Sequence, residues 1–233
     1  MRSRRKPQFM LPGAPLGFPD PNIADDEGLL AIGGDLSPER LLFAYERGIF
    51  PWYDEGLPPM WWSPNPRAVM DVEHLHVSRS LSRVIRSQRF RVTFNCAFRD
   101  VILECGLERD SGTWILPEMV DAYCALHALG HAHSVEVWQG QLLVGGLYGV
   151  QRGALFAAES MFHRERDASK VGLVTAVERL FAAGIVLFDV QFLTDHLKSL
   201  GAYEMPRSRY LELAAEAAKR SVPLAERDIF PVP

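Results

Sequence analysis

The segment from Gly28 to Met70 most constrains how this chain can fold, because it is dense in Trp, Pro and Gly. Trp52, Trp61 and Trp62 are three of the five tryptophans in the chain, and prolines stand at positions 51, 58, 59, 64 and 66. Proline fixes φ and removes a backbone donor, so the segment does not read as an ordinary helix or sheet. Two interpretations remain open: a small core filled by tryptophan, or an aromatic surface on stiff loops that binds something flat or apolar.

The rest of the chain predicts helices and strands around a central meander. Ser37 and Pro38 begin a helix that ends at Gly48. Further helices are predicted over residues 80–87, 97–108, 117–129, 168–183 and 206–220, and strands over 91–95, 133–138 and 185–193, with two more that end near Val150 and Ser160. The strand predicted over residues 185–193 is almost entirely apolar, as a strand buried on both faces would be. Residues 1–27 are expected to be irregular.

This order of elements indicates an α+β fold or mixed α/β layers. We place a domain boundary at the end of the Pro-rich connection, which divides the chain into a small amino-terminal domain, 1–66, and a larger domain, 67–233.

Composition excludes a few classes of protein. The formal net charge of −4 over 233 residues argues against a chain that is basic throughout, although a local basic patch remains possible. No apolar run is long enough for a transmembrane helix, and Pro and Gly interrupt the start of the chain, which makes a poor signal peptide. The cysteines, Cys96, Cys105 and Cys124, are odd in number and lack metal-site spacing. They favour reduced thiols and a cytoplasmic location.

A cluster of arginines forms the clearest basic feature. The interval between Glu73 and Asp100 contains no acidic residue. Within it Arg79, Arg83 and Arg86 are spaced i, i+4, i+7 and so share one face of the predicted helix, with Arg89 shortly after. A one-sided arginine face is typical of phosphate binding, and the alternative is a solvated face with no partner.

Three polar residues are candidates for chemistry. Asp189 and Gln191 stand two apart on the apolar strand, where we expect them to face the same side. Buried polar groups need partners, so they form either a structural pair or a site at the end of the strand. Glu159 ends the third predicted strand of the meander, where the ordinary interpretation is an exposed carboxylate.

Two other patterns carry less weight. His131 and His133 alternate on a strand without further ligands at metal-site spacing, so we predict structural histidines and no metal. Gly145, Gly146 and Gly149 are not followed by the Lys-Ser/Thr of a phosphate loop, and they suit bulges in a sheet.

Long motifs resemble the leucyl/phenylalanyl-tRNA–protein transferase family of bacterial enzymes. The matching strings are GLLAIGGDL at 28–36, GIFPW at 48–52, WWSPNPRA at 61–68, GTWI at 112–115, GHAHSVEVW at 130–138, GGLYGV at 145–150, ESMF at 159–162 and DVQFLTDHLKSLG at 189–201. The resemblance covers the chain from about Gly28 to Tyr210. It implies an acetyltransferase-like (GNAT) fold for the larger domain, close to the peptidoglycan-building aminoacyltransferases, and implies no cofactor.

The resemblance also implies a reaction. Leucine or phenylalanine, and less so methionine, would move from aminoacyl-tRNA to the amino-terminal Arg or Lys of an acceptor protein, marking that protein for degradation. Asp189 would orient Gln191, which contacts the attacking amine. Because a neutral amide is a very weak base, we expect Gln191 to position the amine, and leave proton removal to Asp189, water or the tRNA. Glu159 would meet the α-ammonium of the aminoacyl group.

The resemblance also implies which residues bind the tRNA and the amino-acid side chain. The basic cluster, Arg79, Arg83, Arg86 and Arg89, would dock the acceptor end of tRNA. Trp52 and Trp114 would lie nearer the terminal adenosine, and an apolar pocket for the amino-acid side chain would be formed by Leu147, Phe156, Met161, Ala176, Leu180 and Phe188. For each apolar residue the alternative is an ordinary core position. Leu147 stands where the family commonly has Met and Ala158 where it commonly has Gly, so the ranking of Leu against Phe stays open.

Two other functions remain as alternatives. An acyl-CoA-dependent N-acetyltransferase would normally show a Gly-rich pyrophosphate loop before a helix, and residues 166–172 supply none. A non-catalytic tRNA-binding module would keep the arginine face but would have no reason to bury Asp189 and Gln191.

Overall fold

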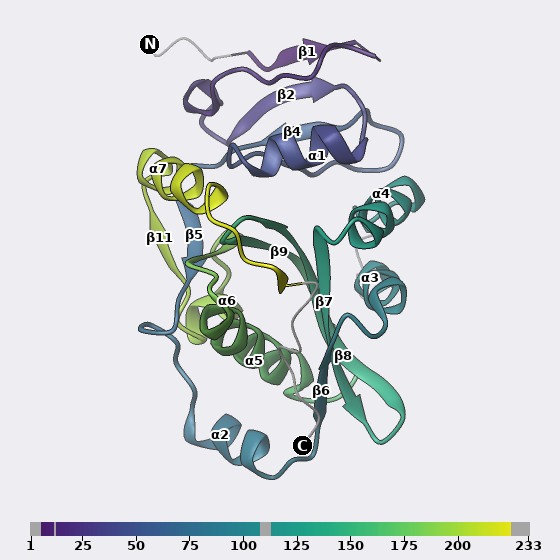
Figure 1. Cartoon of the computed structure of the whole chain (residues 1–233), viewed down its shortest axis with the longest axis vertical. Helices are drawn as coiled ribbons and strands as arrows, with labels where there is room; N and C mark the ends of the chain where they lie inside the picture. Colours follow the sequence, from purple (N-terminus) through teal and green to yellow (C-terminus); the bar gives the residue numbers. More distant parts are fainter. Residues whose placement is uncertain (1–5, 12, 108–112, 225–233) are drawn as a thin grey trace.

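The computed structural model describes residues 6–11, 13–107 and 113–224. The ends predicted for two features, Glu108 of a helix and Gly112 of the GTWI motif, lie outside these residues. Two sheets follow one another along the long axis of the molecule (Figure 1). Their strand orders are β1-β2-β4-β3 for the small sheet and β11-β5-β10-β9-β8-β7-β6 for the large one.

The strands of the small sheet lie where the chain was predicted to be irregular or unsuited to a sheet, so that prediction was wrong, whereas the helix predicted after Ser37 is present. The elements of this part of the chain are β1 (Gln8–Met10), the short 3₁₀ helix η1 (Pro21–Ile23), β2 (Leu29–Gly33), α1 (Pro38–Tyr45), β3 (Phe50–Pro51) and β4 (Met60–Trp62). The strands are very short, and Pro51 lies in the edge strand β3, where a missing backbone donor costs no ladder bond. Short strands of this kind show no periodic pattern in the sequence.

The large sheet contains the predicted meander. Strands β7 (Ala132–Gln139), β8 (Leu142–Arg152) and β9 (Leu155–His163) pair antiparallel. Strand β10 (Leu187–Gln191) then runs parallel to β9 and antiparallel to β5 (Arg67–Met70). The edges are β6 (Arg91–Phe94) and β11 (Tyr203–Met205). This mixed sheet beside a smaller amino-terminal one confirms the predicted α+β class, although β5 and β11 were not predicted.

Helices cover both faces of the large sheet (Figure 1). Helices α3 (Phe98–Leu107) and α4 (Pro117–Ala128) lie on one face, and α5 (Ala168–Ala183) lies on the other. Helix α5 has the predicted bounds and closes at Gly184, whose φ of 113° suits glycine. The remaining helices are α2 (Arg79–Arg86), α6 (Asp195–Ser199), which was not predicted, and α7 (Arg207–Ala218).

One hydrophobic core joins the small sheet to the large one. Leu41, Tyr45 and Trp61 from the amino-terminal part are fully buried in the same cluster as Val101 of α3 and Met119 of α4. The boundary after residue 66 falls between β4 and β5, and as a division into domains it stays a prediction.

His133 has the structural role predicted for it. The ring is fully buried, with Nδ1 3.0 Å from Asn95 Nδ2 and Nε2 3.0 Å from Gln151 Oε1. Burial lowers the pKa of the imidazole to about 4. The pairing of β8 is irregular beside two of the predicted glycines, next to Gly145 and between Tyr148 and Gly149. A Cβ at Gly149 would come within 2.4 Å of the Ala157 carbonyl. Within the described residues, no helix is both long and apolar enough to cross a membrane.

Candidate functional site

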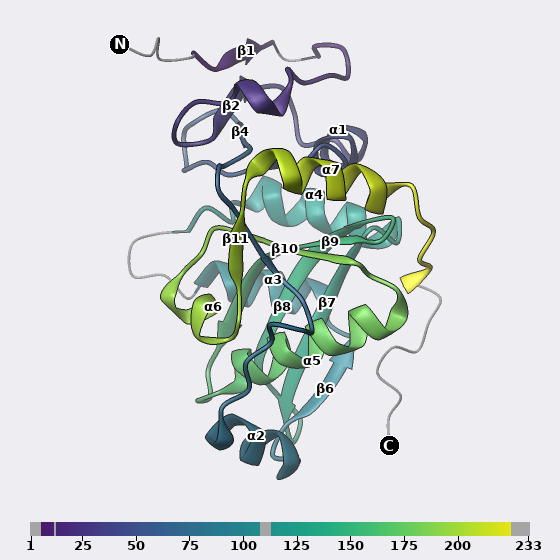
Figure 2. The same cartoon turned by 90° about the vertical axis from the view of Figure 1, so that its left-hand side faces the viewer.

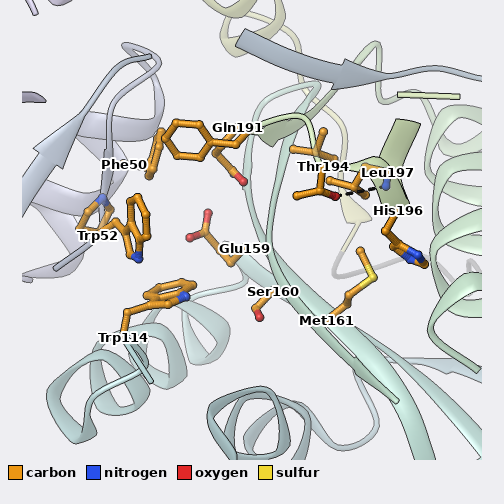
Figure 3. A pocket seen from close by; sticks show the side chains of 13 residues that line it. Phe50, Trp52, Trp114, Glu159, Ser160, Met161, Gln191, Thr194, His196 and Leu197 are labelled. Carbon is orange, nitrogen blue, oxygen red and sulfur yellow. Dashed lines mark hydrogen bonds between the residues drawn. The ribbon is translucent and has the colours of Figure 1, made fainter. Parts of the chain in front are cut away.

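A pocket of about 520 Å³ opens where the small sheet meets β9, β10 and α6 (Figure 3). It is lined by Phe50, Pro51, Trp52, Trp114, Glu159, Ser160, Met161, Val190, Gln191, Phe192, Thr194, His196 and Leu197. Aromatic rings occupy one end of the pocket, and Met161, Thr194, His196 and Leu197 occupy the other, with Glu159 and Gln191 between them. One cavity therefore combines an aromatic wall, a carboxylate and an amide.

The aromatic end explains the tryptophan-rich segment. Trp52 is 40% exposed, and its ring lies 5.7 Å from the rings of both Trp62 and Phe192. The indole of Trp62 donates to the Trp52 carbonyl at 2.6 Å, which holds the loop in place. Trp61, in contrast, is fully buried and donates to the Gly33 carbonyl. Both interpretations of the segment therefore apply: Trp61 fills a core, and Trp52 belongs to an exposed aromatic surface.

Glu159 presents one carboxylate oxygen to the pocket. Its Oε2 accepts a hydrogen bond from the Tyr123 hydroxyl at 3.2 Å, and Tyr123 in turn lies 2.5 Å from the Tyr45 hydroxyl. Oε1 is buried and has no hydrogen-bond partner among the described residues. Burial raises the pKa of the Glu159 carboxyl to about 8. Glu159 thus combines a raised pKa with a buried oxygen that has no hydrogen-bond partner in the part of the chain that the structure describes, and a nearby cation would favour its ionised form.

Gln191 faces Glu159 from the end of β10. The residue is 8% exposed, and its Nε2 is buried without a hydrogen-bond partner among the described residues. Its backbone is left-handed, with a φ of 56°, which is uncommon outside glycine. An unpaired amide in an uncommon backbone conformation is typical of a residue held ready for a ligand.

Asp189 does not line the pocket, and the prediction that it faces the same side as Gln191 was wrong. A bulge makes Asp189 and Gln191 pair with consecutive residues of β5, Val69 and Ala68, so their side chains point to opposite faces of the sheet. The Asp189 carboxylate is fully buried and accepts two hydrogen bonds from Arg67, at 2.8 and 2.6 Å. It also accepts the backbone N–H of Gln191 at 3.0 Å.

Of the residues predicted to form an apolar pocket, only Met161 lines this cavity. Trp52 and Trp114 line it as well. The other predicted apolar residues are at most 1% exposed and pack in the core beside α5; they are Leu147, Phe156, Ala176, Leu180 and Phe188. Each of these five therefore occupies the alternative core position.

Several lining residues were missed by sequence reasoning, although most stand inside motifs already noted. Phe50 and Pro51 belong to the GIFPW string, and Ser160 belongs to ESMF. Val190, Phe192, Thr194, His196 and Leu197 all belong to DVQFLTDHLKSLG. The length of that last string was the available signal, since the strand alone does not account for residues after Gln191.

The predicted basic face exists but lies away from the pocket. Arg79, Arg83 and Arg86 are exposed on α2, which occupies the end of the molecule opposite the small sheet (Figure 2). Arg89 differs, because it forms an ion pair with Glu165 at 2.5 Å. No α2 residue is among the described residues that line the cavity.

Comparison with known proteins gives a consistent result over most of the chain. Family models described as leucyl/phenylalanyl-tRNA protein transferase N-terminal domain and leucyl/phenylalanyl-tRNA protein transferase match residues 34–65 and 69–215. A leucyl/phenylalanyl-tRNA–protein transferase from Anaeromyxobacter sp. (strain Fw109-5) is 54% identical over 88% of each chain. The enzyme of that name from Citrobacter koseri is 50% identical over 89% of this chain and 90% of its own.

Solved structures show more distant likenesses. L-PGS from Bacillus licheniformis is 10% identical, with a TM-score of 0.40 over 72% of this chain and 57% of its own. A GCN5-related N-acetyltransferase-like protein from Streptococcus suis is 14% identical, with a TM-score of 0.32 over 69% of this chain and 61% of its own.

Proposed function

This chain belongs to the leucyl/phenylalanyl-tRNA protein transferase family, and we propose that its pocket holds the aminoacyl end of a charged tRNA beside the amine that attacks it. The protein is an aminoacyltransferase that moves leucine or phenylalanine from aminoacyl-tRNA to a protein. The observation that carries the site assignment is a pair of polar atoms in one cavity with an exposed tryptophan. These atoms are Glu159 Oε1 and Gln191 Nε2, and neither has a hydrogen-bond partner within residues 6–11, 13–107 and 113–224.

The finer assignment of substrates is part of the proposal. The donors are leucyl-tRNA and phenylalanyl-tRNA, with methionyl-tRNA a poorer donor, and the acceptor is a protein whose first residue is Arg or Lys. Transfer marks that acceptor for degradation. The compartment is the cytoplasm, where charged tRNA is found.

Transfer depends more on aligning the acceptor amine with the aminoacyl ester than on activating either group. An aminoacyl ester is already reactive, so the acceptor amine attacks the carbonyl carbon, a C–N bond forms and the ester C–O bond breaks. The tRNA hydroxyl leaves and takes up a proton. Correct placement of the two reactants can contribute about 7–11 kcal/mol to such a step. No covalent intermediate on the protein is required.

Each polar group has a separate part in this alignment. Glu159 receives the α-ammonium of the aminoacyl group, and the approach of that charge favours the ionised carboxylate. Gln191 positions the attacking amine through its amide. Asp189 holds the backbone of Gln191, and its burial and full set of hydrogen bonds make it the least suitable of the three proton acceptors considered. Water or the tRNA then takes the proton.

The apolar lining receives the amino-acid side chain. Met161, Val190 and Leu197 offer an apolar surface next to Glu159. A hydrophobic pocket separates substrates that differ by one methylene by only about 1–3 kcal/mol, which fits an enzyme that accepts more than one amino acid. Trp52 and Trp114 stack against the terminal adenosine at the aromatic end.

A direct transfer assay tests the function. Radiolabelled leucine on tRNA should appear in a protein that begins with Arg, and a matched protein that begins with Gly serves as the control. Labelled acetyl-CoA in place of charged tRNA tests the acetyltransferase alternative. Absence of leucine transfer by the wild-type protein would refute the proposed function.

The resemblance implies that the arginines of α2 dock the acceptor end of tRNA, but α2 lies away from the pocket, so we propose that they contact tRNA phosphates at a distance from the aminoacyl group. Replacing Arg83 and Arg86 together by alanine removes two phosphate contacts, so tRNA binding should weaken and its salt dependence should fall by roughly one to two units of slope. Affinity measured by filter binding at several salt concentrations checks this. Arg209→Ala with Lys219→Ala removes the same charge from α7 and should leave the slope unchanged. Equal affinity of the Arg83/Arg86 variant at low salt would exclude this docking site.

A further inference from the structure

Arg67 is a buried cation that does not line the pocket but contacts Asp189 of β10 and Phe50 of β3, next to two of its walls. It begins β5, is 1% exposed and has no part in the proposed function above beyond its pairing with Asp189. Burial opposes its charge, but the adjacent Asp189 carboxylate raises the pKa of the guanidinium above its usual value. Arg67 therefore stays charged although it lies in the interior.

On one side, Arg67 fixes the end of β10. Its Nε and Nη2 donate hydrogen bonds to the two carboxylate oxygens of Asp189, and the Tyr210 hydroxyl from α7 donates to the same carboxylate at 2.9 Å. That carboxylate accepts the backbone N–H of Gln191. The left-handed turn that aims the Gln191 amide into the pocket is thus held by a chain of hydrogen bonds that begins at Arg67.

On the other side, Arg67 fixes the aromatic wall. Its Nη1 donates to the Gly48 carbonyl at 2.9 Å, and its guanidinium lies 4.8 Å from the centre of the Phe50 ring. Phe50 lines the pocket and packs edge-on against Phe192. One guanidinium therefore sets the distance between the wall contributed by β3 and the amide contributed by β10.

We propose that Arg67 is a positioning residue for aminoacyl transfer, because it holds the Gln191 amide and the aromatic wall at a fixed separation. This rests on the proposed function. A planar guanidinium with several fixed donors can serve Asp189, the Gly48 carbonyl and the Phe50 ring together, whereas a lysine offers a single point of charge. Small displacements of aligned reactants are costly, since about 1 Å can cost about 100-fold in rate.

The test compares Arg67→Lys with Tyr210→Phe and with a matched control. Arg67→Lys keeps the charge beside Asp189 but loses the paired Nε and Nη2 donors of the guanidinium. Tyr210→Phe removes a single hydrogen-bond donor from the same carboxylate. Arg40→Lys is the control, because Arg40 is also a buried arginine of the amino-terminal half, bonded to the Ala14 carbonyl and paired with Asp35, but does not line the pocket. Transfer kinetics are measured well below the thermal transition of each variant.

For Arg67→Lys we expect kcat to fall about 10- to 100-fold while KM for leucyl-tRNA stays within about twofold. Tyr210→Phe should lower kcat by about 3- to 10-fold, and Arg40→Lys should leave it unchanged. A purely structural role would lower the transition temperature without changing kcat of the folded fraction. Unchanged kcat in folded Arg67→Lys would overturn the proposal. If Arg67→Lys fails to fold, unchanged kcat in Tyr210→Phe would overturn it. Wild-type transfer in the same assay tests the proposed function separately.

Discussion

Replacing Asp189 by alanine should abolish detectable transfer and lower the free energy of unfolding by about 3–5 kcal/mol. The reason is that the substitution leaves the Arg67 guanidinium buried without its partner, and also removes the acceptor for Tyr210 and for the Gln191 backbone. Urea denaturation followed by fluorescence measures the stability, and transfer of labelled leucine measures the activity.

An exposed ion pair gives the matched control for this result. Asp121 lies 3.6 Å from Arg99, and both side chains are mostly exposed. Pairs of this kind contribute about 0–1 kcal/mol, so Asp121→Ala should change the stability little. If Asp189→Ala were as mild as Asp121→Ala, the buried network would not hold the site as described.

Replacing Glu159 by glutamine should lower transfer. Above about pH 5 it should also raise the free energy of unfolding relative to the wild type, most of all at alkaline pH. Binding of the α-ammonium would lose a charge-assisted hydrogen bond, so kcat/KM should fall by about 10- to 100-fold. The glutamine variant is the more stable because the pKa of Glu159 is raised from about 4.5 to about 8 on folding, so ionisation of the carboxyl favours the unfolded wild type. That stability is complete below pH 4.5 and is lost as the pH rises through 8, whereas glutamine loses none.

The size of this second effect follows from the pKa shift. Between pH 5 and pH 8 the stability difference between variant and wild type should grow by about 1.4 kcal/mol per pH unit, and it should level off at about 5 kcal/mol near pH 9. Urea denaturation at a series of pH values measures it. Glu212→Gln, at an exposed position on α7, is the control and should show no such trend. A stability difference that is independent of pH would contradict the buried, neutral carboxyl.

The sequence predicts those elements whose signals are local. Helix α5 has both an apolar stripe and a terminal glycine, and the meander has turn residues between its strands, so their bounds were close to correct. Strands β5 and β11 have four residues or fewer, too few to show alternation. The small sheet was missed for the same reason.

The site was predicted less well, because its geometry depends on a bulge and on contacts distant in sequence. The spacing of Asp189 and Gln191 suggests one shared face, but the bulge between them reverses that relation. Arg67 lies within a quoted motif, yet nothing local links it to a carboxylate 122 positions later. The apolar candidates were chosen by motif position alone, and that choice does not distinguish a pocket wall from the core behind it.

The core shared by the two sheets also bears on how such proteins can be recombined. Tyr45 of α1 meets Tyr123 of α4 at 2.5 Å, and Tyr123 supports Glu159. A chimera that joins the first 66 residues of one family member to the remainder of another would bring together halves of a core from different parents. Such a chimera is therefore expected to need matched side chains on both sides of this contact, because the two sheets share one hydrophobic core.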